Sequence, residues 1–335
     1  MVNTVIHSWR VVRRSAHRPA LRAAAGFAAL IPVTVAGLLA DPRSLGGQPI
    51  WEKPFKFSVS LALYLGTIAL LVPLVRRRGR RVAGGAATAI AVAMSVEMAL
   101  ILTQVVRGRA SHFNFSTPAD TVIAQVMGAG AIVAWLLTAV LAGLLLRERT
   151  LPAPLHRALG LGLLVALAGM SVAFLMVVPT AAQLAAAPAH GVPVLGGHAV
   201  GVADGGPGLP LLGWSTTGGD LRIGHFVGLH ALQGLPLLAL ALKAAGRRWR
   251  PLASESVQAR LVTVAAGGWL GLTGLLTWQA LRAQPLLAPD STTLATLTGL
   301  VLAVAGATTL VLRHGPGRFP KAPVVSTPNS AVSRA

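Results

Sequence analysis

The sequence predicts an all-α integral membrane protein with about eight transmembrane helices. Of the 335 residues, 54% are hydrophobic and only 11% are charged, whereas about a quarter of the residues of a soluble domain are charged. Apolar stretches of roughly 20 residues recur along the chain, and that length spans the hydrocarbon core of a bilayer. Clusters of basic residues lie in every second connection between these stretches. Lipid must therefore be the solvent for most of the apolar surface.

Eight stretches have the length and composition of a membrane span. The predicted bounds are 20–40, 55–75, 82–106, 121–146, 157–180, 223–245, 257–281 and 292–312. Basic residues are concentrated in the connections 76–81, 147–149 and 243–250. If the N-terminus is cytoplasmic, these connections are cytoplasmic too, and all but seven of the 29 Lys and Arg lie on that side. The positive-inside rule therefore predicts that both termini are cytoplasmic.

The order of the spans divides the chain into four segments. Residues 1–19 form a basic cytoplasmic N-terminus, and 20–150 form a first unit of four helices. Residues 151–314 form a second four-helix unit with a long outer loop at 181–221, and the Pro- and Ser-rich 315–335 form a disordered cytoplasmic tail. The excess of arginine over lysine and the abundance of alanine indicate a bacterial cytoplasmic (inner) membrane protein.

The third and seventh spans end in similar sequences. "LTQVVRGR" (102–109) and "LTWQALRAQ" (276–284) each carry Thr, then Gln, then Arg at the exit from the span. The two sites are four spans apart and so have the same orientation in the membrane. The similarity therefore predicts a parallel 4+4 internal repeat whose halves are related by an axis along the membrane normal. The alternative is that membrane spans in general share similar end chemistry.

The net charge of +20 comes mainly from basic residues in the predicted cytoplasmic segments. Basic residues beside the spans attract anionic lipid headgroups at the cytoplasmic face, at about 1 kcal/mol each. We therefore expect membrane lipids as partners and no nucleic acid. The absence of cysteine excludes disulfides and thiolate metal ligands. The sequence names no cofactor, and we predict no metal ligands.

Polar and cationic residues collect on the predicted outer side, where they could bind a small-molecule or lipid-linked ligand. The predicted binding residues are Lys53, Lys56, Arg107, Arg109, His112, Asn114, Arg222, His225 and Arg282. Lysines at this depth also extend their amines to the interface without any ligand. A histidine at the interface can likewise contact a headgroup only.

Three polar residues lie deeper, at similar predicted depths: Glu97, His230 and Gln233. A carboxylate in hydrocarbon costs about 2.5–3.5 kcal/mol on insertion scales, so Glu97 should face the bundle interior and find a partner. His225 and His230 are five residues apart and point in different directions on a helix, whereas His230 and Gln233 share a face. We therefore expect Glu97, His230 and Gln233 to form a proton-handling group, with Arg222 and His225 higher, near Arg107 or His112.

The patches "WEKPFKFSVS", "RGRASHFNFS" and "GDLRIGHFVGLHALQ" resemble an uncharacterised group of bacterial multi-pass inner-membrane proteins. The group has no established activity, so the resemblance implies a site on the outer side and no particular reaction.

Three classes of function remain open at this point. The first is a proton-coupled transporter that uses the deep polar group. The second is a membrane enzyme at the outer face, acting on a lipid-linked or anionic substrate that the arginines would bind. The third is a haem- or metal-binding membrane protein, in which His112 would lie opposite the sixth span.

Overall fold

The computed structural model of the chain describes residues 16–148, 150–180, 183–185 and 194–314. Eight helices in this part are long and apolar enough to cross a membrane, which confirms the predicted fold class. The predicted disordered tail at 315–335 and most of the predicted N-terminal segment lie outside the described residues.

The eight helices coincide with the eight predicted spans. They are α2 (Arg18–Ala40), α3 (Glu52–Leu71), α4 (Arg77–Arg107), α5 (Pro118–Leu146), α6 (Ala153–Met176), α8 (Leu221–Ala245), α9 (Glu255–Leu281) and α10 (Ser291–Arg313). Short 3₁₀ turns, η1 (Val72–Leu74) and η2 (Arg250–Leu252), follow α3 and precede α9. Helix α4 starts five residues before its predicted span because hydropathy detects only the apolar part, whereas arginine favours the helix.

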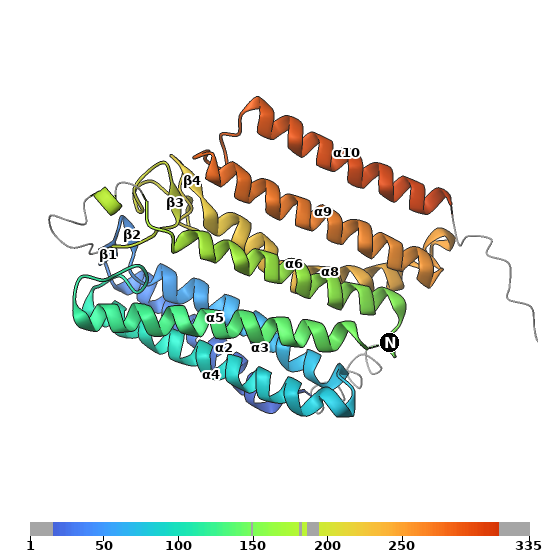
Figure 1. The fold of residues 1–335 in the computed structure, drawn as a ribbon, viewed down its shortest axis with the longest axis horizontal. Helices are drawn as coiled ribbons and strands as arrows, with labels where there is room; N and C mark the ends of the chain where they lie inside the picture. Colours follow the sequence, from blue (N-terminus) through green and yellow to red (C-terminus); the bar gives the residue numbers. More distant parts are fainter. Residues whose placement is uncertain (1–15, 149, 181–182, 186–193, 315–335) are drawn as a thin grey trace, which may run out of the picture.

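Successive helices run in opposite directions between two ends of the bundle, as Figure 1 shows. The loop end holds the connections after α2, α4, α6 and α9, and the arginine end holds those after α3, α5 and α8. Two small antiparallel strand pairs lie at the loop end. They are β1 (Ser44–Leu45) with β2 (Gln48–Pro49), and β3 (Ala199–Val200) with β4 (Gly219–Asp220). Helix α2 begins and α10 ends at the arginine end (Figure 1).

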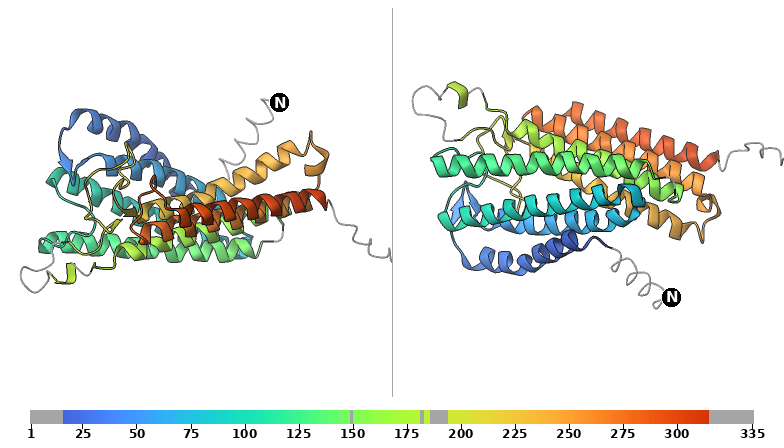
Figure 2. Two further views of the ribbon diagram at one scale, coloured as in Figure 1. Left: turned by 90° about the horizontal axis from the view of Figure 1, so that it is seen from above. Right: turned by 60° about the horizontal axis from the view of Figure 1, so that its bottom comes forward.

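The helices form two groups, α2–α5 and α6–α10, which Figures 1 and 2 show side by side. In each group the first helix packs extensively on the second and the third packs on the fourth. Helices α5 and α6 make the main contact between the groups. The largest core cluster includes buried residues of both groups, such as Ile90 of α4 and Leu163 of α6.

Helices α6 and α8 approach each other closely at two glycines. A Cβ atom added to Gly169 would lie 2.6 Å from the Cα of Gly228, so a side chain at this position would push the helices apart. The Nδ1 atom of His225 lies 2.8 Å from the carbonyl oxygen of Gly169 in the same contact. This histidine therefore bonds the two helices to each other.

Helices α4 and α9 end in the same local conformation. The side-chain amide of Gln104 donates to the carbonyl of Ala110 at 3.0 Å, and that of Gln279 donates to the carbonyl of Pro285 at 2.8 Å, six residues further along in both cases. The fourth residue after each glutamine has positive φ, 67° at Gly108 and 58° at Ala283.

An arginine three residues after each glutamine pairs with an aspartate at the start of the next helix. Arg107 lies 2.7 Å from Asp120, and Arg282 lies 2.5 Å from Asp290. The sequence similarity that predicts the repeat thus coincides with a shared turn structure. Superposition of the two complete halves stays a prediction.

Candidate functional site

A buried carboxylate and a loop histidine meet inside the bundle near the loop end. Glu97 lies on α4, about ten residues before the helix ends, and is 5% exposed. Its Oε1 atom lies 3.2 Å from Nε2 of His112. On the other side of the ring, Nδ1 of His112 lies 2.8 Å from the Nζ atom of Lys53, in the first turn of α3. Lys53, His112 and Glu97 form a continuous chain of polar contacts, which we call the Lys–His–Glu chain.

His112 reaches Glu97 because the loop after α4 folds back over the bundle. Phe113 has a φ of 59°, in the left-handed region that bulky residues rarely adopt. Its carbonyl accepts from the N–H of Leu195, and Asn114 forms an isolated β-bridge with Val194. The side chain of Asn114 also donates to the carbonyl of Ala110 at 3.0 Å. Asn114, a predicted binding residue, therefore holds the loop in place.

The hydrogen-bond partners of His112 determine which ring nitrogen carries the proton. The ammonium of Lys53 can only donate, so Nδ1 of His112 must accept. The hydroxyl of Ser111 lies 3.1 Å from the same nitrogen and can donate to it as well. In the neutral ring the proton is then on Nε2, facing Glu97. Burial, together with the charge of Lys53, lowers the pKa of His112 well below its usual value, which favours this neutral ring at pH 7.

The second oxygen of Glu97 faces helix α5. Oε2 is buried and has no hydrogen-bond partner in the described part of the chain. Gly130 of α5 lies opposite, where an added Cβ would be 3.6 Å from Oε2. A buried oxygen without a partner is costly when charged and far less so when protonated.

A second histidine–carboxylate pair lies next to the Lys–His–Glu chain, in the loop before α8. Nδ1 of His198 lies 3.1 Å from Oδ2 of Asp204, and Asp204 also accepts from the backbone N–H of His198 and Ala199. These bonds lower the pKa of Asp204 to about 2. The ring of Phe113 packs edge-on between His112 and His198, with centroids 6.1 and 5.0 Å away. The loop before α8 thus covers His112 from the loop end.

Most of the predicted outer cations are already paired with acidic residues. Lys56 pairs with Glu52 and donates to the carbonyl of Leu212. Arg222 lies 2.5 Å from Asp220 and donates to the carbonyl of Gly213 at 2.6 Å.

The remaining arginines of the predicted binding set are paired too. Arg107 and Arg109 both bind the buried Asp120, at 2.7 and 2.8 Å. Arg282 pairs with Asp290 and lies over the ring of Trp278. These arginines therefore stabilise the loop end in this structure, and Lys53 is the cation that contacts the histidine.

The predicted pairing of Glu97 with His230 is wrong. Glu97 contacts His112, and in the described part of the chain no hydrogen bond or ion pair joins Glu97 to His230. Gln233, one turn beyond His230, instead donates to the hydroxyl of Thr67 on α3 at 3.1 Å. Glu97 faces α5 at Gly130, and the contact of Gln233 with α3 shows that α8 reaches the first helix group at another side chain.

The expected place of Arg222 and His225 is also only partly right. Arg222 donates to the carbonyl of Gly213, next to the carbonyl of Leu212 that Lys56 binds, which brings it near the first turns of α3. Arg107, by contrast, is bound to Asp120 and Gln104. Sequence reasoning missed the roles of Ser111, His198 and Asp204, which lie in loops without periodicity. The only signal for them was the concentration of histidine and acid near the outer ends of the spans.

Comparison with protein-family models, curated proteins and solved structures found no match. Among the described residues, no group of three or more His, Asp or Glu side chains is arranged to hold a metal ion. The site is defined by its own geometry, a histidine between a lysine and a buried glutamate.

Proposed function

We propose that this chain is a proton-coupled transporter of a bacterial cytoplasmic membrane. In this proposal the Lys–His–Glu chain carries protons between the loop end, facing the outside, and the bundle interior. The observation that supports it is the unbroken contact from Lys53 through His112 to Glu97, which ends on a buried oxygen that has no partner in the described part of the chain. An intramembrane carboxylate with a histidine beside it is a typical proton-relay arrangement.

The proton moves in two coupled transfers. Lys53 gives a proton from Nζ to Nδ1 of His112, while His112 gives its Nε2 proton to Oε1 of Glu97. The lysine then becomes a neutral amine, the histidine stays neutral with its proton on Nδ1, and the carboxylate becomes a carboxylic acid. Water at the loop end restores the lysine proton. Glu97 releases its proton toward the bundle interior when it becomes charged again, and proton exchange with water returns His112 to the tautomer with its proton on Nε2.

The two helix groups provide the movement that transport requires. They meet mainly along α5 and α6, and the hydrogen bond from Gln233 to Thr67 connects α8 with α3 across the same interface. Glu97 lies next to α5, so its charge can influence this interface. Transporters built from two repeats commonly alternate by rocking one half against the other.

An enzyme acting on an anionic substrate at the outer face is less well supported. Such an enzyme needs cations free to bind phosphate or carboxylate. Lys56, Arg107, Arg222 and Arg282 instead pair with carboxylates of the chain itself. This pairing favours the transporter over an anion-binding enzyme.

The proposal can be tested in proteoliposomes that enclose a pH-sensitive dye. Amino acids, organic acids, sugars and inorganic ions would be added in turn, with and without a pH gradient, and proton movement recorded. We expect at least one class to drive proton movement, and we expect Glu97→Gln to abolish it. The matched control is Glu255→Gln, which neutralises an exposed carboxylate at the arginine end. Proton movement that survives in Glu97→Gln would contradict the proposal.

A further inference from the structure

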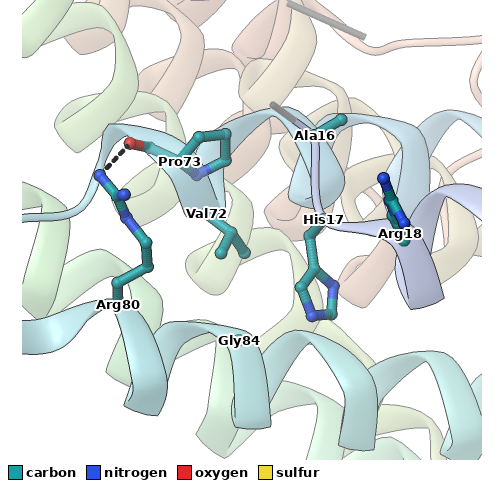
Figure 3. A pocket seen from close by; sticks show the side chains of 7 residues that line it. All are labelled: Ala16, His17, Arg18, Val72, Pro73, Arg80 and Gly84. Atoms are coloured by element: carbon teal, nitrogen blue, oxygen red, sulfur yellow. Dashed lines mark hydrogen bonds between the residues drawn. The ribbon is translucent and has the colours of Figure 1, made fainter. Parts of the chain in front are cut away.

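A cavity lies at the arginine end, at the other end of the helices from the Lys–His–Glu chain. It has a volume of about 490 Å³ and lies between the start of α2, the turn η1 and the first turns of α4. Figure 3 shows the side chains around it. The cavity is lined by Ala16, His17, Arg18, Val72, Pro73, Arg80 and Gly84.

Arg80 is fixed on one wall of this cavity. Its Nε atom donates to the carbonyl of Val75 at 3.2 Å and its Nη2 atom donates to that of Pro73 at 3.1 Å, a bond drawn in Figure 3. The Nη1 atom makes no hydrogen bond within the described residues. A guanidinium held in one orientation, with donors left over, is preorganised to bind an oxyanion.

The opposite wall carries Arg18 and His17. Arg18 is exposed, and in the part of the chain that the structure describes it has no hydrogen bond or ion pair. His17 lies above Gly84, whose added Cβ would be 3.6 Å from the Nε2 atom of the ring. The Nδ1 atom of His17 is buried without a partner among the described residues. The Nε2 atom of His17 lies 3.4 Å from the hydroxyl of Thr88, so what this wall offers a ligand is the second guanidinium.

None of the described residues that line the cavity is acidic. The nearby Glu148 accepts from the backbone N–H of Arg76 at 2.7 Å and lies 3.3 Å from its guanidinium, so it is already engaged. Four more arginines follow Arg76 within residues 77–81. The potential in the cavity is therefore positive, which excludes a cation and favours an anion.

We infer that this cavity binds a phosphate group through the guanidinium of Arg80, with Arg18 on the far side of the cavity adding to the positive potential. The remaining wall, formed by Val72 and Pro73, is apolar. The cavity also lies at the end of membrane-length helices, at the depth where lipid headgroups lie. A phosphate of an anionic phospholipid and free inorganic phosphate share this chemistry. The inference is independent of the proposed transport function.

The test compares both sources on the purified full chain. Native mass spectrometry would measure binding of dioleoylphosphatidylglycerol against dioleoylphosphatidylcholine, and thermal unfolding would compare inorganic phosphate with chloride at equal ionic strength. We expect a preference for phosphatidylglycerol or a stabilisation by phosphate, weakened about ten- to hundredfold in Arg80→Gln. Arg18→Gln should weaken binding too, and it breaks no hydrogen bond within the described residues, so it also tests the site if Arg80→Gln unfolds.

Arg250→Gln is the matched control, because it removes an exposed arginine at the same end but outside the cavity. It should leave binding within about twofold of the unmodified chain. An effect in the lipid arm alone assigns the phosphate to a lipid, and an effect in the phosphate arm shows that the phosphate group suffices. Equal weakening by Arg250→Gln and Arg80→Gln, or no response in either arm, would overturn the inference.

Discussion

Nε2 of His112 lies 3.2 Å from Oε1 of Glu97, so a loop histidine contacts a carboxylate well inside helix α4. The same ring contacts Lys53 on its other side at 2.8 Å. The loop end of the bundle is therefore connected to its interior through one side chain. Removal of His112 should separate Glu97 from Lys53 without changing any helix.

Glu97 and His112 should behave as one unit in transport. Glu97→Gln and His112→Gln should each reduce proton movement to near background, and the double variant should be no worse than either single one, because both break the same path. The measurement is proton flux in proteoliposomes at equal protein content. His230 lies outside the Lys–His–Glu chain, so any effect of His230→Ala on proton flux should be independent of the effect of Glu97→Gln. Fully additive losses for Glu97 and His112 would show that they act separately.

The stability of the protein should fall as the pH falls from about 7 to 5. Burial lowers the pKa of both His112 and His198, so the unfolded chain takes up protons below its histidine pKa of about 6.5 that the folded chain does not. Each such proton contributes a slope of up to about 1.4 kcal/mol per pH unit. Asp204, with a pKa of about 2, stays charged over this range.

Thermal unfolding in detergent at a series of pH values would measure this effect. The loss of Tm between pH 7 and 5 should be smaller in His112→Gln than in the unmodified chain. His314→Gln, at an exposed histidine after α10, should leave the slope unchanged. An identical pH slope in His112→Gln would mean that this histidine is not held neutral by the fold.

The two aspartates that pair with arginine at the loop end should differ in their importance for stability. The side chain of Asp120 is 0% exposed and binds two arginines, whereas that of Asp290 is 37% exposed. Asp120→Asn removes the charge that Arg107 and Arg109 bind, and because their side chains are 31% and 42% exposed it should cost about 2–3 kcal/mol of unfolding free energy. Asp290→Asn keeps a residue that can cap α10 and loses only an exposed ion pair, so it should lower the unfolding free energy less than Asp120→Asn does. Unfolding in mixed micelles, followed by tryptophan fluorescence, would compare them, and equal losses would contradict the assignment.

The orientation of the bundle remains a prediction, based on the distribution of arginine. Reporter fusions within 76–81 and 246–254 should read as cytoplasmic, and those within 108–117 and 194–220 as periplasmic. The Lys–His–Glu chain would then open to the outside and the phosphate cavity to the cytoplasm. Periplasmic signals from the arginine end would reverse the direction of proton movement proposed above.

The sequence was sufficient to predict the helices but not the partner of Glu97. Hydropathy and end residues are local properties, so the eight spans and the shared turns after Gln104 and Gln279 could be found from the residues themselves. Depth also showed that Glu97 needs a partner inside the bundle. The identity of that partner depends on a loop that turns at Phe113 and is held by residues about 80 positions away in the chain. No periodic pattern encodes such a contact.

The central claim, that Glu97 exchanges its proton through His112, can be measured directly by infrared difference spectroscopy of the carboxyl stretch. The purified chain in lipid would be stepped between alkaline and acidic buffer. We predict one protonated-carboxyl band that appears on acidification, is absent in Glu97→Gln, and appears at a shifted pH or more slowly in His112→Gln. Glu255→Gln should retain the band. A band that is identical in the unmodified chain and in Glu97→Gln would contradict the account.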